Sequence, residues 1–162
     1  DYKTFLDALS LTRNRGIFTG VHLIVGFPTE TRDEIFAMAD EISGIKPDFL
    51  KIHQLQVIKD TPLAEMYKEN PFHTFEYEEY LDFVVDFIER LSPEIVLQRL
   101  FATAPDDILI APRWDKSRYE VTRDIEKRFV QRDTFQGKRY KIQDTGCRMQ
   151  DKQTACITHR ES

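Results

Sequence analysis

Hydrophobic positions along this chain follow two alternating periods, one typical of helices and one typical of strands. Repeats at three and four positions predict helices over residues 2–14, 31–43, 62–69, 75–91 and 117–130. Short apolar runs between them predict strands over residues 20–26, 49–58 and 95–100, and a helical turn is expected within residues 106–112. Helices that alternate with strands are typical of βαβ units, in which neighbouring strands run parallel.

The order of these elements predicts an α/β fold that is open on several sides. About three parallel strands with covering helices form an incomplete sheet, because its faces and edges still need partners. We therefore expect a partial (β/α) barrel over residues 1–140, followed by a polar, mobile tail over residues 141–162. The chain opens on Asp1 without a methionine and already within a helical pattern, so we expect it to be a piece of a longer protein.

The stretch Val21–Thr31, with the sequence VHLIVGFPTET, predicts a strand, a tight turn and the start of a helix. Gly26 and Pro28 end the apolar run, and Thr31 with Glu34 matches a capping box for the first helical turn. In α/β proteins, ligands bind at such junctions, at the carboxyl ends of strands. Because Gly26 has no Cβ, a ligand ring could approach its backbone closely. An ordinary βα turn has the same pattern, and both interpretations stay open.

The second predicted strand is polar on both of its faces, which is unusual for a buried parallel strand. Lys51 and His53 share one face, and Gln54 and Gln56 share the other. One face must therefore meet water, a ligand or buried partners, and both ligand contact and structural hydrogen bonding stay open. On the first strand, His22 would point into the barrel, either as a structural group or as a catalyst.

Two further polar groups follow predicted strands. Lys59 comes after the second strand, where its ammonium group either meets an anionic ligand or stays solvated beside the helix cap at Thr61. Asp106 and Asp107 follow the third strand, either as a carboxylate pair or as a helix cap. The sequence contains no Ser-His-Asp arrangement, P-loop or GxGxxG motif.

Charge and cysteine content exclude several classes of protein. The net charge is −5, with 10 basic against 18 acidic residues (−8) in residues 1–100 and 13 against 10 (+3) in residues 101–162. The acidic body argues against broad nucleic-acid binding, while the basic end permits a local contact. No apolar run approaches the roughly 18 residues of a membrane span, so we expect a cytoplasmic protein without a membrane partner. Cys147 and Cys156 lack the spacing of a metal site, and we expect no metal ligands in the chain.

With its segments in order, the chain resembles the radical S-adenosylmethionine (SAM) superfamily, in particular the Elongator-catalytic-subunit-like branch with its YhcC-type bacterial proteins. The resemblance covers residues 1–140 and rests on the segments Ile24–Thr31, Lys51–Leu63, Glu79–Leu91, Ala104–Pro112 and Asp133–Gly137. It implies that the chain is the C-terminal half of a radical SAM barrel. In the intact protein a [4Fe–4S] cluster would donate an electron to SAM and generate a 5′-deoxyadenosyl radical.

The resemblance also implies which residues surround the cofactor and the substrate. The residues implied near SAM are His22, Ile24, Gly26, Phe27 and Pro28 and, as weaker candidates, His53, Gln56, Val57 and Ile58. Lys59 and Arg99 would lie on the substrate side. The partners implied are the missing N-terminal half of the same protein and a substrate that is a small molecule or an RNA. A dimer through the exposed sheet edge is a further expectation.

Two departures from the family pattern change what the chain can do. The CxxxCxxC loop that binds the cluster is absent and would lie upstream of Asp1, so we expect no catalytic residue here and neither cluster nor SAM retained. Asp60 stands where the family usually has glycine before Thr61, which leaves the local backbone path open. Two other classes remain: a non-catalytic α/β interaction module, or an enzyme of another barrel family with His22 and His53 as acid and base.

Overall fold

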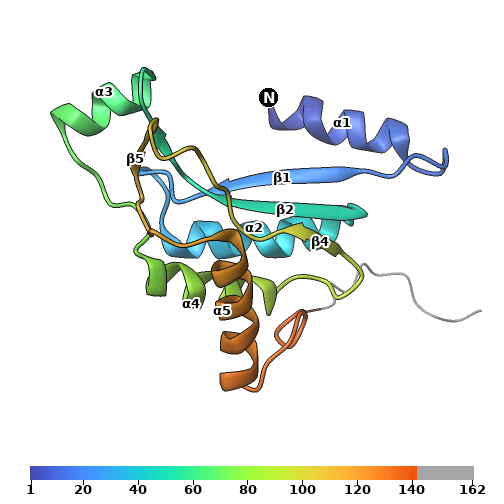
Figure 1. Cartoon of the computed structure of the whole chain (residues 1–162). Coiled ribbons are helices and arrows are strands. Elements are labelled where there is room, and N and C mark those ends of the chain that lie inside the picture. The colour runs from blue at the N-terminus through green and yellow to red at the C-terminus, as the bar shows by residue number, and fades with distance from the viewer. Residues whose placement is uncertain (142–162) are drawn as a thin grey trace, which may run out of the picture.

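The computed structural model describes residues 1–141, so Cys147, Cys156 and the predicted tail from residue 142 onward lie outside the described residues. Helices and strands are interspersed along the chain, singly or in pairs, as Figure 1 shows. In order, the elements are α1 (Tyr2–Thr12), β1 (Gly20–Val25), α2 (Arg32–Ile45), β2 (Phe49–Gln54), β3 (Val57–Ile58), α3 (Pro62–Glu69), α4 (Tyr77–Ile88), β4 (Val96–Arg99), β5 (Leu109–Ala111) and α5 (Arg118–Gln131).

Three of the strands form a parallel sheet in the order β1-β2-β4. The pairing of β1 with β2 is regular from Gly20 to Val25. The pairing of β2 with β4 has an irregularity after Leu50, which brings Lys51 opposite Arg99. The predicted α/β fold, with three parallel strands and covering helices, is therefore confirmed.

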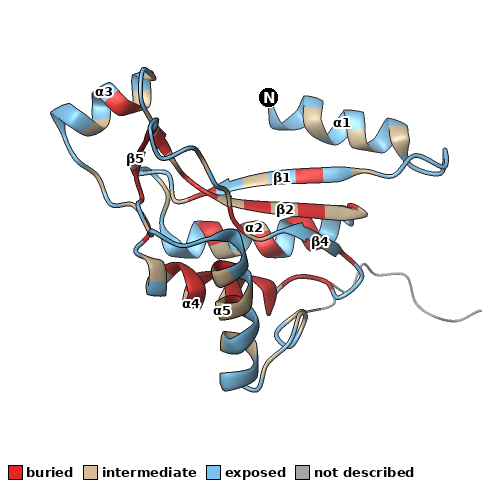
Figure 2. Ribbon diagram, in the orientation of Figure 1, coloured by how far each residue is buried: buried red, intermediate tan, exposed pale blue. Residues whose placement is uncertain are grey.

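Helices α2 and α4 cover one face of this sheet, and α5 packs against α4 (Figure 1). Helix α2 begins at the predicted capping box, in which the Thr31 side chain accepts from the Glu34 amide and the Glu34 carboxylate accepts from the Thr31 amide. Helix α4 repeats its apolar residues every three or four positions and supplies large buried side chains, among them Tyr80, Phe83 and Phe87. The main core lies between these helices and the sheet (Figure 2).

The single strand predicted over residues 49–58 is wrong, because β2 ends at Gln54 and the chain enters a second sheet at Val57. The buried Gln54 side chain lies at this break. Its Oε1 accepts from the Ala102 amide (2.8 Å), and its Nε2 donates to the Ala102 carbonyl (2.9 Å). Of the two interpretations left open for Gln54, the structure shows structural hydrogen bonding.

The helix expected toward Pro112 is also wrong beyond its first residues. A turn forms over residues 106–108, but Leu109–Ala111 is strand β5, which pairs antiparallel with β3. Leu109 and Ala111 are buried and Ile110 between them is half-buried, an alternation typical of a strand. The apolar run was too short for its period to distinguish the two structures.

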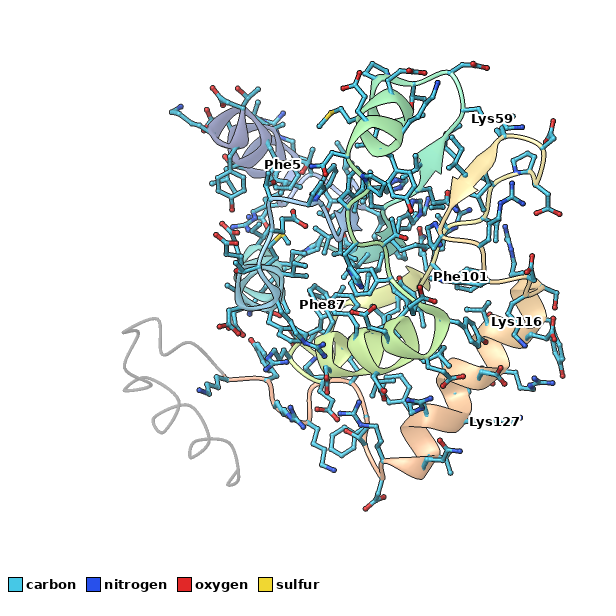
Figure 3. The ribbon with its side chains drawn as sticks, turned by 90° about the vertical axis from the view of Figure 1, so that its left-hand side faces the viewer. Phe5, Lys59, Phe87, Phe101, Lys116 and Lys127 are labelled. Atoms are coloured by element: carbon cyan, nitrogen blue, oxygen red, sulfur yellow. The ribbon has the colours of Figure 1, made fainter. Side chains whose placement is uncertain are left out.

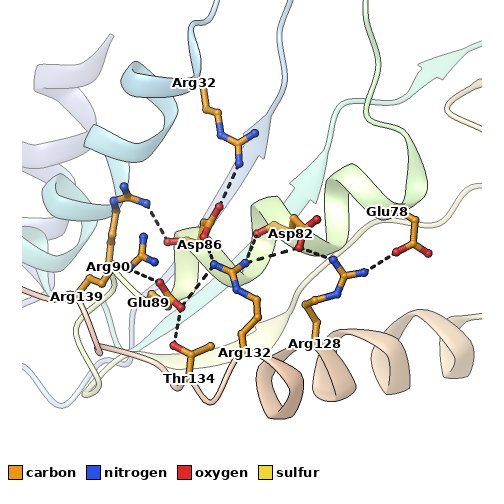
Figure 4. Close-up of polar contacts among 10 residues, drawn as sticks. All are labelled: Arg32, Glu78, Asp82, Asp86, Glu89, Arg90, Arg128, Arg132, Thr134 and Arg139. Atoms are coloured by element: carbon orange, nitrogen blue, oxygen red, sulfur yellow. Dashed lines mark hydrogen bonds and ion pairs between the residues drawn. The ribbon is translucent and has the colours of Figure 1, made fainter.

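Helices α4 and α5 are joined by a row of ion pairs, which Figure 4 shows. Arg128 pairs with Glu78 and Asp82, and Arg132 pairs with Asp86. All three acids belong to α4, Arg128 belongs to α5 and Arg132 is the C-cap residue of α5. The acidic side of α4 is therefore the seam between the two helices.

The C-terminal strap, residues 133–139, folds back on the end of α4 (Figure 4). The Thr134 hydroxyl donates to the carboxylate of Glu89 (2.6 Å), and Arg139 forms an ion pair with the same carboxylate (2.6 Å). Gln136 donates to two backbone carbonyls beyond α4 (2.7 and 2.8 Å), and the Gly137 amide donates to the Ile88 carbonyl (3.2 Å). The strap therefore belongs to the folded body.

The second face of the sheet is less covered by the described residues. Helix α1 contacts α2 at both of its ends: Tyr2 donates to Glu41, and Arg13, just after the helix, donates to the Ile45 carbonyl (2.6 Å). None of the residues of α1 is buried (Figure 2). On β1, the Ile24 side chain is 45% exposed. Within residues 1–141, no helix is both long enough and apolar enough to cross a membrane.

Candidate functional site

The turn after β1 is held in shape by the carboxylate of Glu30. Its Oε2 accepts hydrogen bonds from the amides of Gly26 (3.1 Å) and Phe27 (3.0 Å). Gly26 has a φ of +92°, a conformation that side chains with a Cβ rarely adopt. The ring beside the missing Cβ is that of Phe75, which comes from the segment before α4 and would lie 2.7 Å from such a Cβ. The ring that lies close to the Gly26 backbone is therefore that of Phe75, a residue of the chain itself.

A cavity of about 210 Å³ lies beside this turn, at the helix-covered side of the sheet, because residues of α2 and α4 also line it. Its lining includes Phe27, Pro28, Phe72 and Phe75. At its border the His73 Nε2 lies 3.0 Å from a carboxylate oxygen of Glu79. Aromatic rings around a small cavity suit a flat aromatic ligand, because such a ligand can stack on them.

The open face of the sheet carries polar side chains from three strands. Along β1, Val21 and Val25 are buried while His22 and Ile24 are exposed, so the latter two lie on the open face. Along β2, Lys51 and His53 are half-buried on that same face. The predicted inward orientation of His22 agrees with this placement. The rings of His22 and His53 have their centroids 5.8 Å apart.

The electrostatic environment on the open face is positive. Burial lowers the pKa of His53 below its usual range, and the neighbouring Arg99, His22 and Lys51 lower it further. The Nε2 atom of His53 is buried and has no hydrogen-bond partner among the described residues. An imidazole with these neighbours is held in its neutral form and can accept a proton or a hydrogen bond.

The remaining predicted residues follow the break between β2 and β3. Gln56 donates to the Ala102 carbonyl (3.4 Å), beside Gln54. Val57 is fully buried in a second, smaller core, so only its backbone remains for contact with a ligand. Ile58 is half-buried and pairs with Leu109 of β5.

Lys59 donates a hydrogen bond to the backbone carbonyl of Asp107, at the outer side of the β3–β5 sheet (Figure 3). Lys59 directly follows β3 of the two-stranded sheet, whereas Arg99 ends β4 of the three-stranded sheet, so the two predicted substrate-side residues belong to different sheets. Asp60 has a φ of +60°, so the backbone takes the path that glycine would allow.

Two features of the site were missed by the sequence reasoning. Lys51 was not among the predicted site residues, although a lysine at a half-buried strand position was a usable signal. A second cavity of about 110 Å³ lies beyond β4, lined by Gln56, Trp114 and Lys116 among others. The Trp114 Nε1 donates to the Phe75 carbonyl (2.9 Å), which joins the wall of this cavity to that of the first. No pattern in the sequence pointed to that contact between distant segments.

The described residues do not fit an iron–sulfur cluster. A [4Fe–4S] cluster is held by about three or four cysteine thiolates, and the whole chain has two cysteines. Residues 1–141 also contain no group of three His, Cys, Asp or Glu side chains that could hold a metal ion. In contrast, the cavity beside Gly26 offers aromatic rings to a base.

Three parallel strands with helices on one face and an open second face define part of a (β/α) barrel. Residues 47–131 match the family described as the Radical_SAM C-terminal domain. The chain belongs to this family, as the resemblance of its motifs predicted.

The chain is also similar to individual proteins. The chain is 28% identical to YtqA of Bacillus subtilis over 138 residues, which are 85% of this chain and 43% of YtqA. It is 28% identical to YhcC of Escherichia coli over 119 residues, 74% of this chain and 38% of YhcC. A solved structure of Elp3 from the archaeon Methanocaldococcus infernus, with an N-terminal deletion, matches with a TM-score of 0.72 and 21% identity, over 83% of this chain and 32% of that chain. The Elp3 match shows a shared fold, and the chain spans less than half the length of these relatives.

Proposed function

We propose that this chain forms one wall of the SAM and substrate cavity of a radical SAM iron–sulfur enzyme, of the Fe–S oxidoreductase type. It would work together with a segment that carries the CxxxCxxC cluster loop and would be inactive without it. The observation that carries the proposal is the match of residues 47–131 to the Radical_SAM C-terminal domain. The Gly26 turn and its aromatic cavity, at the carboxyl end of a parallel strand, support it.

In this proposal the chain positions the cofactor and shapes the space for the substrate. When bound, SAM and its cluster would supply the radical that starts the reaction. The exposed ring of Phe27 and the backbone of Gly26 would border the base, while Glu30 fixes the turn. Ile24 would give an apolar contact on the open face, and His53 a neutral polar one.

The test is anaerobic reconstitution of the full-length protein with iron and sulfide, followed by SAM and a one-electron reductant. We expect 5′-deoxyadenosine as a product, detected by chromatography. Ile24→Glu should abolish its formation, because it places a charge on the open face. Ile108→Glu is the matched control, since Ile108 is 37% exposed but lies near the β3–β5 sheet. A reconstituted protein that holds a cluster and forms no 5′-deoxyadenosine would refute the proposal.

The 162-residue chain by itself should bind SAM weakly or not at all. The resemblance implies that the cluster chelates the methionine end of SAM, and this chain cannot hold the cluster. Isothermal titration calorimetry of the purified chain with SAM checks this expectation. Micromolar binding would contradict it.

A second candidate function is acid–base catalysis by His22 and His53. The 5.8 Å between their ring centroids and the lowered pKa of His53 favour it. In this case activity of the full-length protein would survive an iron chelator and would be lost in His53→Gln. Activity that depends on iron would exclude this candidate.

A further inference from the structure

We propose that Lys51 and Arg99, with His22 and His53 beside them, bind an anionic group of the substrate, either a carboxylate or a phosphate. The inference rests on the proposed function, because it assumes that the open face lines a substrate cavity. It adds the chemical class of the substrate and assigns the contact to Lys51, which was not among the site residues that the family resemblance implied.

The first support is the alignment of these side chains across the sheet. Lys51 of β2 lies opposite His22 of β1 on one side and opposite Arg99 of β4 on the other. Neighbouring strands lie about 4.8 Å apart, so the three residues form a row across the sheet. His53 follows Lys51 by two positions and therefore lies on the same face, one step closer to the carboxyl end.

The second support is that the two cations have no acidic partner within the part of the chain that the structure describes. None of the ion pairs within residues 1–141 involves Lys51 or Arg99. By contrast, Arg128 of α5 and Arg132 at its C-cap each pair with acids of α4. The buried Nε2 of His53 also has no partner in this part of the chain. Two adjacent unpaired cations repel each other, and an anion between them removes that repulsion.

The third support is the match between the donors and an oxyanion. A guanidinium group and an ammonium group only donate hydrogen bonds, and both suit the oxygens of a carboxylate or phosphate. The depressed pKa of His53 agrees with a positive field at this position.

The position of the row favours the substrate over the cofactor. His22, in the same row, precedes Gly26 by four residues, so the row lies about 13 Å along the strand from the Gly26 turn. In the proposed arrangement the nucleoside of SAM occupies the turn. The row then lies deeper in the barrel, where a substrate would extend below the cofactor.

The experiment uses the 162-residue chain and inorganic phosphate as the probe. Histidine ring resonances are followed by NMR at constant ionic strength and pH. Phosphate should shift the resonances of His22 and His53 saturably, with a Kd of about 1–10 mM. His73, whose partner is Glu79 beside the other cavity, is the internal control and should not respond.

Variants then test which cations hold the phosphate. Lys51→Met and Arg99→Met should each weaken binding by about tenfold or more, whereas Lys51→Arg should retain it. Lys59→Met is the matched control, since Lys59 binds a backbone carbonyl elsewhere and its loss should leave the Kd unchanged. Unchanged histidine dispersion shows that each variant is folded. No saturable shift, an equal response of His73, or unchanged binding in Lys51→Met and Arg99→Met would overturn the proposal.

A competition experiment with the cluster-loaded full-length protein, which is expected to bind SAM, and without reductant distinguishes a substrate site from a site for the SAM carboxylate. Phosphate that stays bound in the presence of SAM supports a substrate site. Displacement by SAM but not by methylthioadenosine, which lacks the carboxylate, would assign the row to the cofactor and overturn the substrate assignment. These results do not depend on 5′-deoxyadenosine formation, so the anion site and the proposed function can fail separately.

Discussion

At the scale of single residues, Gly26 is a position that cannot take a side chain without strain. Its positive φ and the Phe75 ring beside it both exclude a side chain. The sequence indicated that something flat would approach this glycine, but not that Phe75, far along the chain, would do so. Contacts between distant segments depend on tertiary packing, which local patterns do not contain.

We expect Gly26→Ala to lower the free energy of unfolding by about 2–4 kcal/mol, from the strained φ and the displaced ring. Urea denaturation followed by circular dichroism measures it. Gly20→Ala is the control, because the nearest atom to its Cβ would be 3.8 Å away, and its effect should stay below about 1 kcal/mol. Equal losses in the two variants would contradict the role of Phe75.

The pKa of His53 provides a second residue-scale prediction. Because its pKa in the folded chain lies below the ordinary value of about 6.5, the unfolded chain binds this proton more readily. The contribution of His53 to stability is therefore full above the ordinary pKa and is lost as the pH falls toward the folded pKa. Arg99→Met should raise the folded pKa measured by NMR titration, while Arg123→Met, which replaces an arginine paired with Asp124, should not.

At the scale of elements, the long periodic segments were predicted well and the short ones were not. Helix α4 was evident from its apolar repeat, and the capping box fixed the start of α2. β5, with three residues, offered too little pattern to separate strand from helix. The break after Gln54 depends on its hydrogen bonds to Ala102, a partner that only the folded chain brings near.

The sequence predicted which side chains of each strand lie on the open face, but not how the strands align. Alternation along β1 placed His22 on the correct side. Alternation along β2 likewise placed Lys51 and His53 on one face. That Lys51 lies opposite Arg99, however, follows from the irregularity after Leu50. Such a shift in register has no signal in the sequence of either strand.

The C-terminal strap leads to a prediction for Glu89, whose residue is 2% exposed. We expect Glu89→Gln to cost about 2–4 kcal/mol, since it weakens the contacts to Thr134 and Arg139 in a buried setting. Limited proteolysis should then cut the strap sooner, and urea denaturation gives the stability change. Glu94→Gln, with a side chain 77% exposed and 4.0 Å from Lys46, should change stability by less than about 0.5 kcal/mol. Similar effects for both would argue against the strap as an anchor.

At the scale of the whole molecule, residues are buried from solvent to very different extents in different elements. The main core lies between the sheet, α2 and α4, whereas α1 contributes no buried residue. The chain also spans less than half the length of YtqA and YhcC. In the proposed enzyme, further segments would cover the open face and α1.

Hydrogen exchange should reveal this uneven protection. Amides of α1 should exchange fastest among the helices of residues 1–141, and those of α4 slowest, because local opening follows buried contact. Mass spectrometry of peptides from the labelled chain measures the order. Protection of α1 equal to that of α4 would mean that something already covers it, such as a second copy of the chain.

The carboxylate of Glu30 limits which ligands the turn after β1 can bind. Glycine turns that lead into a helix commonly seat phosphates, because their free amides attract negative charge. Here the amides of Gly26 and Phe27 already donate hydrogen bonds to the carboxylate of Glu30. A phosphate arriving at this turn would meet repulsion, whereas an uncharged base or a sulfonium centre would not.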